Sequence, residues 1–464
     1  MHGFGPFETA AIVAMVVAYI LFTTWLTVKL RSRTSGEFMY AARSLPAFVV
    51  GTLMMSEFIG AKSTIGAAQT AFESGLAASW AVLSAAIGFA LFGILLSRKF
   101  YNSGEFTISG AIGKKYGRST QLTVSLIMIY ALLLVNVGYY VSGAAAVSVV
   151  LRVSLPVAAI ITALVCTFYC AIGGLKSVAY VSLLHTFIKY AGVLVILVVA
   201  LTMTHGVLPM VNQMPNFYFT WDGKIGATTL IAWIIANVGA VFSTQYIVQA
   251  ISSVNNPDHV RRSTYIAALL CVPISIMIGL IGVAAKFLFP DIKSLYAIPV
   301  FLDQMNFALA GFVTISLAAS VFVGVSSITL AISSLVMNDF YVPLFRPTPQ
   351  MEFKMARLLS IPIGFLPLIF VFFVPHVLQL SFFTRALRLS IAIVAMMAFY
   401  LPFFQSGRGA TLGLMGAAIS TTVWYLLDNP FGIDNIYIAL TTPPIIMVLE
   451  KLIGKIGTPD TGSV

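Results

Sequence analysis

Residues 54–69 read MMSEFIGAKSTIGAAQ, and they place two charged side chains inside an apolar stretch that runs from Leu45 to Ala71. The charged residues are Glu57 and Lys62. An ionised side chain in a bilayer core costs a few kcal/mol or more, so such residues usually face the interior of a helix bundle and act on a substrate or ion pathway. The two residues are five apart, whereas neighbours on one helix face are three or four apart. We therefore predict a helix break near Gly60 that lets both head groups point into one cavity.

The composition of the whole chain indicates a membrane protein. Its 464 residues are 59% hydrophobic and 9% charged, whereas soluble domains carry about 25% charged residues. Apolar runs recur throughout, and each is long enough to cross roughly 30 Å of hydrocarbon as a helix of ~20 residues. The alternating short strands of a membrane barrel do not occur in the sequence. We therefore expect an all-α polytopic membrane protein.

About thirteen transmembrane helices are predicted, within a single membrane domain that covers residues 1–464. The predicted spans are residues 9–30, 46–73, 75–98, 120–150, 155–173, 177–201, 225–251, 263–289, 306–335, 356–374, 378–404, 408–427 and 432–450.

Basic residues in the connecting segments predict the orientation. With the N-terminus outside, the inward segments hold 18 Lys and Arg residues, and the outward segments hold 3, namely Arg152, Lys224 and Lys293. The positive-inside rule therefore places the N-terminus outside and the C-terminus in the cytoplasm, as a multi-pass protein of the plasma (bacterial inner) membrane. The net charge of +11 reflects this topology and attraction to the lipid bilayer rather than nucleic-acid binding.

No enzyme site is recognisable, because the chain has no nucleophile elbow, phosphate-binding loop or HExxH motif. We expect no enzyme activity, no cofactor and no obligatory protein partner.

Further charged residues lie within predicted spans. Lys189 is in the middle of the sixth span, and His185 lies four residues earlier on the same face. Lipid exposure of such residues would be costly, which favours a functional role. Arg385 and Arg388 lie three apart in the outer half of the eleventh span, either as an attractor for anions or as anchors that reach the interface.

Several motifs together resemble the sodium/solute symporter family, which includes sodium/glucose, sodium/proline and sialic acid transporters. The resemblance runs from Gly36 to Tyr341. Its motifs are GEFMYAARSLP at 36–46, IGAKSTIG at 59–66, VSGAAAVSVVL at 141–151, AIGGLKSVAYVSLLHTFIKYAGVLVI at 171–196, QYIVQAISSVNNPDHVRR at 245–262 and SSLVMNDFY at 333–341.

The resemblance implies the inverted-repeat fold of the leucine transporter, with five helices in each repeat. Residues 46–201 would form the first repeat and 225–404 the second, with one extra helix at 9–30 and two more within 408–450. In this architecture the first helix of each repeat is broken at mid-membrane, where the substrate binds. We expect the second break at Asn237 and Gly239, which makes Asn237 a candidate substrate-binding residue.

The resemblance also implies a sodium site formed by two carbonyls of the first broken helix and three residues of the ninth span. An ungapped alignment puts the carbonyls at Ser56 and Ile59 and the first of the three residues at Ser320. The other two positions are Val323 and Gly324, whose side chains carry no oxygen. A hard cation requires several oxygen ligands, so Na⁺ would bind at Ser56, Ile59 and Ser320 only if this reduced site is retained.

Two further segments bear on the coupling ion. Relatives often have Thr-Asp after the Gly-Gly turn of the sixth span, where this chain has Val181 and Ser182. Ser326 and Ser327 lie one turn beyond the expected ligands and could form a displaced site. A lysine ammonium is a compact point charge, and some proton-coupled transporters of this fold use a lysine on the fifth core helix in place of sodium. Lys189, or alternatively Lys62, is the candidate for that role.

These observations predict a solute:cation symporter that imports a small organic solute, preferably a carboxylate-bearing anion. Glu57, Lys62, Asn237 and Arg388 are the candidate substrate-binding residues. The resemblance implies sodium coupling, but the missing ligands favour proton coupling or sodium independence. The alternatives are a sodium-coupled amino-acid symporter and a membrane sensor that retains the transporter fold. About a dozen polar residues after the last span argue against the sensor.

Overall fold

The computed structural model describes residues 4–32, 34, 37–38, 41–172, 174–373 and 377–456. Within these residues the chain is helical, with no strand beyond one isolated bridge between Leu45 and Val254. Nine of the described helices are long and apolar enough to cross a membrane, and one bent pair counts as a tenth. The all-α membrane architecture is therefore confirmed, while the count of thirteen spans stays a prediction. Gly36, Met39 and Tyr40 of the first family motif lie outside the described residues.

Each predicted span coincides with one helix or with two consecutive helices. The helices that correspond to the spans are α1 (Pro6–Lys29), α3 (Ala47–Phe58) with α4 (Ala61–Ser74), η2 (Leu76–Ser79) with α5 (Trp80–Leu95), α8 (Arg118–Leu151), α9 (Leu155–Ile172), α10 (Leu175–Met203), α12 (Ala227–Ser243) with α13 (Gln245–Ser252), α14 (His259–Leu288), α15 (Phe307–Val336), α17 (Pro349–Phe365) with η7 (Leu366–Phe373), α18 (Val377–Tyr400), α19 (Gly407–Leu426) and α20 (Asn435–Ile456).

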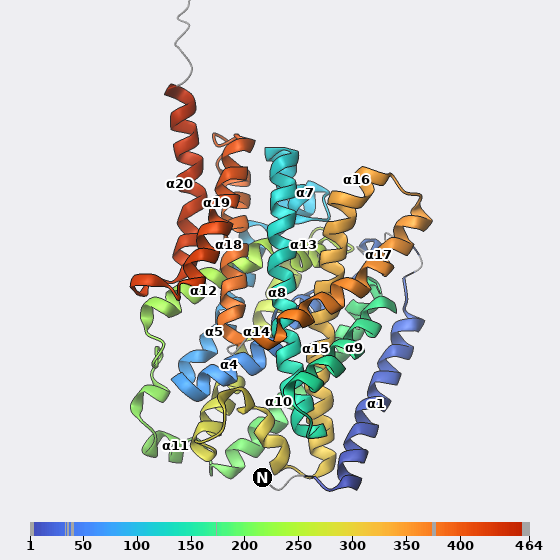
Figure 1. Ribbon diagram of the computed structural model, residues 1–464, viewed down its shortest axis with the longest axis vertical. Coiled ribbons are helices and arrows are strands. Elements are labelled where there is room, and N and C mark those ends of the chain that lie inside the picture. The colour runs from blue at the N-terminus through green and yellow to red at the C-terminus, as the bar shows by residue number, and fades with distance from the viewer. Residues whose placement is uncertain are drawn as a thin grey trace, which may run out of the picture.

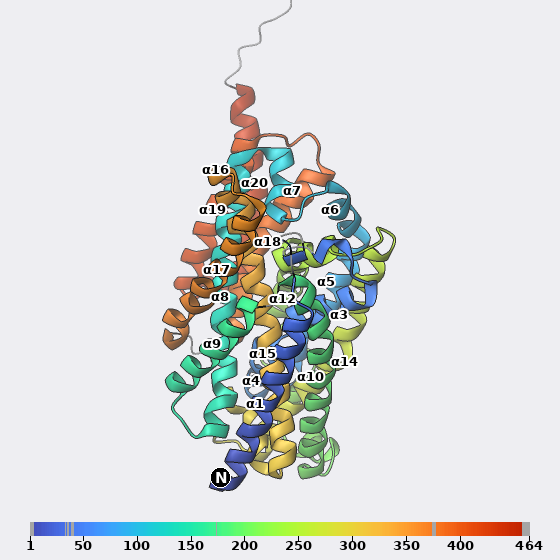
Figure 2. The same ribbon diagram turned by 90° about the vertical axis from the view of Figure 1, so that its right-hand side faces the viewer.

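The long helices lie roughly along one axis, with α8, α15 and α18 in the interior (Figure 1). α15 and α18 are largely buried, whereas most of α1 and α20 is exposed on the sides of the bundle. α1 lies at one edge, and α19 and α20 pack together at the other (Figures 1 and 2). This arrangement positions the two broken helices, α3–α4 and α12–α13, against the buried interior.

The first break lies where the sequence predicts it. α3 ends at Phe58 and α4 begins at Ala61, with Ile59 (φ −107°, ψ 71°) and Gly60 (φ −95°, ψ −167°) in non-helical conformations between them. A Cβ built on Gly60 would overlap the ring of Tyr139 from α8, and one built on Gly324 of α15 would overlap the same ring. The two glycines therefore allow the Tyr139 ring to pack directly against both backbones, in a contact that joins three helices.

The second break differs from the prediction. α12 continues through Asn237 and Gly239 and ends at Ser243, and Thr244 (φ −67°, ψ 128°) separates it from α13 at a bend of 46°. Gly239 lies where α12 approaches α18 so closely that a Cβ would overlap Leu389. The glycine therefore serves helix packing, and the break forms at a threonine whose hydroxyl bonds to the carbonyl of Ala240.

We predict that Gly60→Ala and Gly324→Ala each destabilise the protein, because the added methyl group overlaps the buried Tyr139 ring. Overpacking of this kind costs about 1–3 kcal/mol, measurable as a lower Tm of the detergent-purified protein. Gly138→Ala on α8 is the matched control, since its Cβ would come no closer than 3.5 Å to Lys62. An unchanged Tm in the first two variants would contradict the packing described here.

Candidate substrate and ion site

The carbonyl groups at the first break have partners from the following turn of the chain. The Ser63 hydroxyl donates to the Phe58 carbonyl at 3.2 Å, and the Thr64 hydroxyl donates to the Gly60 carbonyl at 3.1 Å. A helix end leaves such carbonyls without intrahelical partners, and in a membrane water cannot replace them. The Ser63 hydroxyl therefore satisfies a carbonyl that the end of α3 exposes, whereas the Gly60 carbonyl also accepts the backbone N–H groups of the first turn of α4.

Two other helices supply donors to two further carbonyls at the break. The Tyr139 hydroxyl of α8 donates to the Glu57 carbonyl at 2.8 Å. The Lys189 ammonium of α10 donates to the Ile59 carbonyl at 2.7 Å and to the Ser56 hydroxyl at 3.1 Å. Lys189 is 1% exposed. A buried cation is thus hydrogen-bonded to the two residues that the sequence alignment assigns to sodium, with the Ser56 hydroxyl as acceptor rather than its carbonyl.

The other expected sodium ligands have different contacts. The Ser320 hydroxyl donates to the Ser316 carbonyl of its own helix at 3.0 Å. Ser182 is buried, and its hydroxyl has no hydrogen-bond partner among the described residues. Ser326 is buried on α15, and Ser327 lies beside the Glu57 carboxyl without reaching hydrogen-bond geometry.

Glu57 and Lys62 do not pair with each other. No ion pair joins them in the described part of the chain, and both carboxyl oxygens of Glu57 lack a hydrogen-bond partner there. The Lys62 ammonium instead donates to the Ser381 hydroxyl of α18 at 3.0 Å and lies 5.9 Å from the centre of the Tyr139 ring. The two head groups therefore do not contact each other, since Ser327 of α15 lies beside one and Ser381 of α18 binds the other, and their shared cavity stays a prediction.

Arg385 and Arg388 are each 1% exposed, which excludes the interpretation as interfacial anchors. The Arg388 guanidinium donates to the Thr244 hydroxyl at the second break, at 2.8 Å. The Arg385 guanidinium lies over the rings of Phe58 and Phe382, at 5.3 and 4.6 Å from their centres, and its Nε has no partner among the described residues. Both arginines are close enough to Lys62 to repel it electrostatically.

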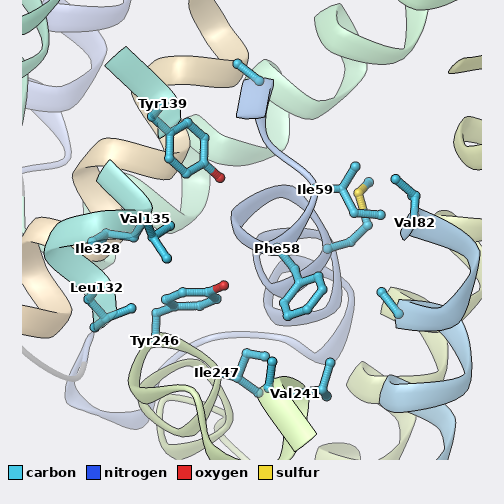
Figure 3. Close-up of a cluster of buried hydrophobic side chains, with 14 of the residues drawn as sticks. Phe58, Ile59, Val82, Leu132, Val135, Tyr139, Val241, Tyr246, Ile247 and Ile328 are labelled. Carbon is cyan, nitrogen blue, oxygen red and sulfur yellow. The ribbon is translucent and has the colours of Figure 1, made fainter. Parts of the chain in front are cut away.

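Tyr139 and Tyr246 connect the acidic and basic parts of this region. Both tyrosines interact electrostatically with Glu57 and with Arg385 and Arg388. Figure 3 shows their hydroxyl groups pointing toward the side on which Phe58 and Ile59 lie. One acidic side chain and two basic ones therefore act on the same two tyrosines.

A polar pocket of about 320 Å³ lies next to this region, between α4, α12, α18 and the connection from α19 to α20. Its lining includes Glu73, Asp434, Trp233 and Phe382. The Trp233 and Phe382 rings are stacked at 4.5 Å, and Arg385 lies against Phe382 as well. The Phe382 ring thus lies between the pocket and the buried guanidinium of Arg385. The pocket is on the side of the bundle that the topology predicts to face outside.

Asn237, the remaining predicted substrate-binding residue, has structural contacts through its amide nitrogen, while its amide oxygen is buried without a partner among the described residues, so its binding role stays a prediction. Its side-chain amide donates to the Ala81 carbonyl at 3.2 Å and to the Ser84 hydroxyl, both on α5. These bonds join α12 to α5, away from the break at Thr244.

Sequence reasoning missed four polar residues of the site, namely Tyr139, Tyr246, Thr244 and Ser381. Each belongs to a predicted span and is fully or almost fully buried. A systematic search for hydroxyl groups at mid-span would have found them, but without the packing it could not separate them from the many serines and threonines that bond to their own helix.

A family model, the sodium:solute symporter family, matches residues 38–413 of this chain. Sodium/glucose cotransporter 4 of Danio rerio is 25% identical over 61% of this chain, and high affinity choline transporter 1 of Homo sapiens is 21% identical over 73% of it. The chain covers 47% and 63% of the lengths of these two relatives.

Two solved structures share the fold. A Na⁺-coupled sialic acid symporter in a substrate-bound outward-open state has a TM-score of 0.83 at 17% identity, with 95% of this chain and 98% of that chain covered. The nucleobase-cation-symport-1 family transporter Mhp1 has a TM-score of 0.57 at 15% identity, with 92% and 96% covered.

We predict that Arg388 and Thr244 act as a unit at the second break. A hydrogen bond to a charged group contributes about 1.5–3 kcal/mol. Thr244→Val and Arg388→Met should therefore be non-additive in unfolding free energy, with a coupling of roughly that size in a double-mutant cycle. Thr264→Val is the matched control for the threonine, because its hydroxyl bonds within its own helix. Strict additivity would show that the contact does not hold the break.

Proposed function

The chain belongs to the sodium:solute symporter family, and within it we propose that this protein imports a small carboxylate-bearing organic solute without sodium at the first helix break. The observation that carries the proposal is the position of the Lys189 ammonium, which donates to the Ile59 carbonyl and the Ser56 hydroxyl. The resemblance assigns those residues to the coupling ion. An ammonium and a sodium ion carry the same charge, so Lys189 can neutralise the same negative helix end.

The residues around Lys189 support this assignment. Val323 and Gly324 offer no side-chain oxygen at the two positions where relatives have hydroxyl groups, and Ser320 bonds to its own helix. A sodium ion would have too few oxygen ligands here. A lysine needs only acceptors for its three N–H groups, and the break supplies two.

The charge balance of the interior supports a carboxylate-bearing solute. Lys62, Arg385 and Arg388 are buried, and none has an acidic partner within ion-pair distance among the described residues. Unpaired buried charges are costly. A solute that brings a negative charge to these groups would relieve that cost when it binds, and a positively charged solute would raise it.

The proposal for the coupling ion rests on the small number of oxygen ligands around Lys189. We propose that a proton gradient, or no ion gradient, replaces the sodium gradient. Purified protein in proteoliposomes should take up radiolabelled acetate, lactate or pyruvate at an equal rate when external sodium is replaced by potassium at constant pH. Strict dependence on sodium would contradict this part of the proposal, and the absence of uptake for all carboxylates and amino acids would favour the sensor alternative.

Lys189→Met is predicted to abolish uptake, because the substitution leaves the Ile59 carbonyl without its donor and removes the charge at the break. Lys176→Met is the matched control, since that lysine pairs with Glu37 outside the site. If Lys189→Met folds, transports and gains no sodium dependence, the assigned role of Lys189 is incorrect.

Lys62→Met is predicted to raise the KM for carboxylate uptake by at least about tenfold, the equivalent of one charge-assisted hydrogen bond. An initial-rate series in proteoliposomes measures this change. Lys286→Met is the control, because the Lys286 ammonium donates to the Pro290 carbonyl at the end of its own helix. An unchanged KM would show that Lys62 does not bind the substrate.

A further inference from the structure

Three buried side chains lie at one level of the bundle, on the same side of the contact between Gly60, Tyr139 and Gly324. They are Asn136 on α8, three residues before Tyr139 on that helix, Ser327 on α15, three residues after Gly324 on that helix, and Glu57 near the end of α3, just before the break that contains Gly60. Residues three apart on a helix lie on one face, one turn along its axis.

The directions of the helices place all three residues on the same side of the contact. The start of α8 lies beside the end of α15, because the Gln121 amide donates to the Asp339 carboxylate at 2.6 Å. α8 and α15 therefore run antiparallel, so that Asn136, before Tyr139, and Ser327, after Gly324, lie at a similar height. The neighbouring positions of Ser327 and Glu57 extend this layer to α3.

These residues carry polar atoms without partners. The Ser327 hydroxyl lies beside the Glu57 carboxyl, but no hydrogen bond of normal geometry reaches either carboxyl oxygen, that hydroxyl or the two amide atoms of Asn136 among the described residues. Each of the three side chains is at most 1% exposed. Buried polar groups are normally hydrogen-bonded, and each exception calls for an explanation.

The chemistry of the layer selects the kind of group that would satisfy it. A carboxylate only accepts hydrogen bonds, whereas a hydroxyl and an amide can accept or donate. An ionised Glu57 is therefore the one side chain of the three that can only accept. Arg385 and Arg388, which interact electrostatically with Tyr139 and Tyr246, and Lys62, which lies over the Tyr139 ring, only donate. The site as a whole thus combines an accepting carboxylate with donating cations.

We propose that Glu57, Asn136 and Ser327 form a subsite for a hydrogen-bond donor on the transported solute, a hydroxyl or an ammonium group close to its carboxylate. This inference rests on the proposed function, because it takes the carboxylate to bind at the basic side chains. The solute is then a hydroxy acid or an amino acid rather than a simple fatty acid.

Three acids with the same carbon skeleton test the subsite. Propanoate, lactate and alanine differ only in carrying hydrogen, hydroxyl or ammonium beside the carboxylate, and their five-carbon homologues cover a larger site. Binding to the purified full-length protein is measured by calorimetry. Lactate or alanine should bind at least about tenfold more tightly than propanoate, the effect of one hydrogen bond to a charged group. Tighter binding of lactate would identify the donor as a hydroxyl group, and tighter binding of alanine would identify it as an ammonium group.

Variants distinguish the residues of the subsite from the basic residue that binds the carboxylate. Glu57→Gln should reduce the preference over propanoate to less than about threefold, and Asn136→Ala and Ser327→Ala should each reduce it as well. Lys62→Met should weaken all three acids by a similar factor. Glu105→Gln, at an acid that pairs with Lys114 in a connecting segment, should leave the preference unchanged. Because Tyr139 bonds to the backbone carbonyl of Glu57, the Gln variant retains that contact.

The outcomes distinguish the subsite from the proposed function. Equal binding of all three acids by the wild-type protein, or a preference that survives Glu57→Gln, would overturn the subsite and leave a carboxylate transporter. A failure of every acid in both series to bind would instead refute the carboxylate site on which the inference rests.

Discussion

The exposed carbonyl groups at the first helix break are the constraint on which the rest of the interior depends. A helix that stops at mid-membrane leaves backbone acceptors where no water is available, and each unsatisfied group costs several kcal/mol. In this chain Ser63 satisfies one of them, and Tyr139 and Lys189 satisfy two more from neighbouring helices. α8 and α10 are therefore tied to the break through the two buried side chains that reach it.

A similar arrangement occurs at the second break. Arg388 of α18 donates to the hydroxyl of Thr244 there, just as Lys189 of α10 donates to the residues of the first break. α10 and α18 are the fifth helices of the two expected repeats, so each repeat places a cation from its last helix at the break of its first. The negative end of a helix dipole favours such a cation at α3. The recurrence fits an inverted repeat, in which each half places a donor from its last helix at the break of its first helix.

The sequence predicted the membrane class, the span positions and the first break, because charge and hydropathy follow directly from the bilayer. It failed where the outcome depends on packing between distant segments. Asn237 and Gly239 have the composition of a helix interruption, yet one bonds to α5 and the other allows close approach to Leu389. Thr244 gives no comparable signal, and its role depends on Arg388, which lies far along the chain. The separation of Glu57 from Lys62 likewise depends on Ser327 and Ser381, which no local pattern connects to them.

The lack of a side-chain oxygen at Val323 and Gly324 and the ammonium of Lys189 at the break fit the same proposal. If Lys189 provides the positive charge there, hydroxyl groups at these two positions are not needed for a cation. A glycine at 324 then gives room to the Tyr139 ring, which also packs on Gly60 and bonds to the Glu57 carbonyl. A larger residue at 324 would displace that ring and leave the carbonyl unsatisfied. Restoring a hydroxyl residue at 324 would therefore disturb the break rather than recover a sodium site, because the space of its side chain is already used by the tyrosine.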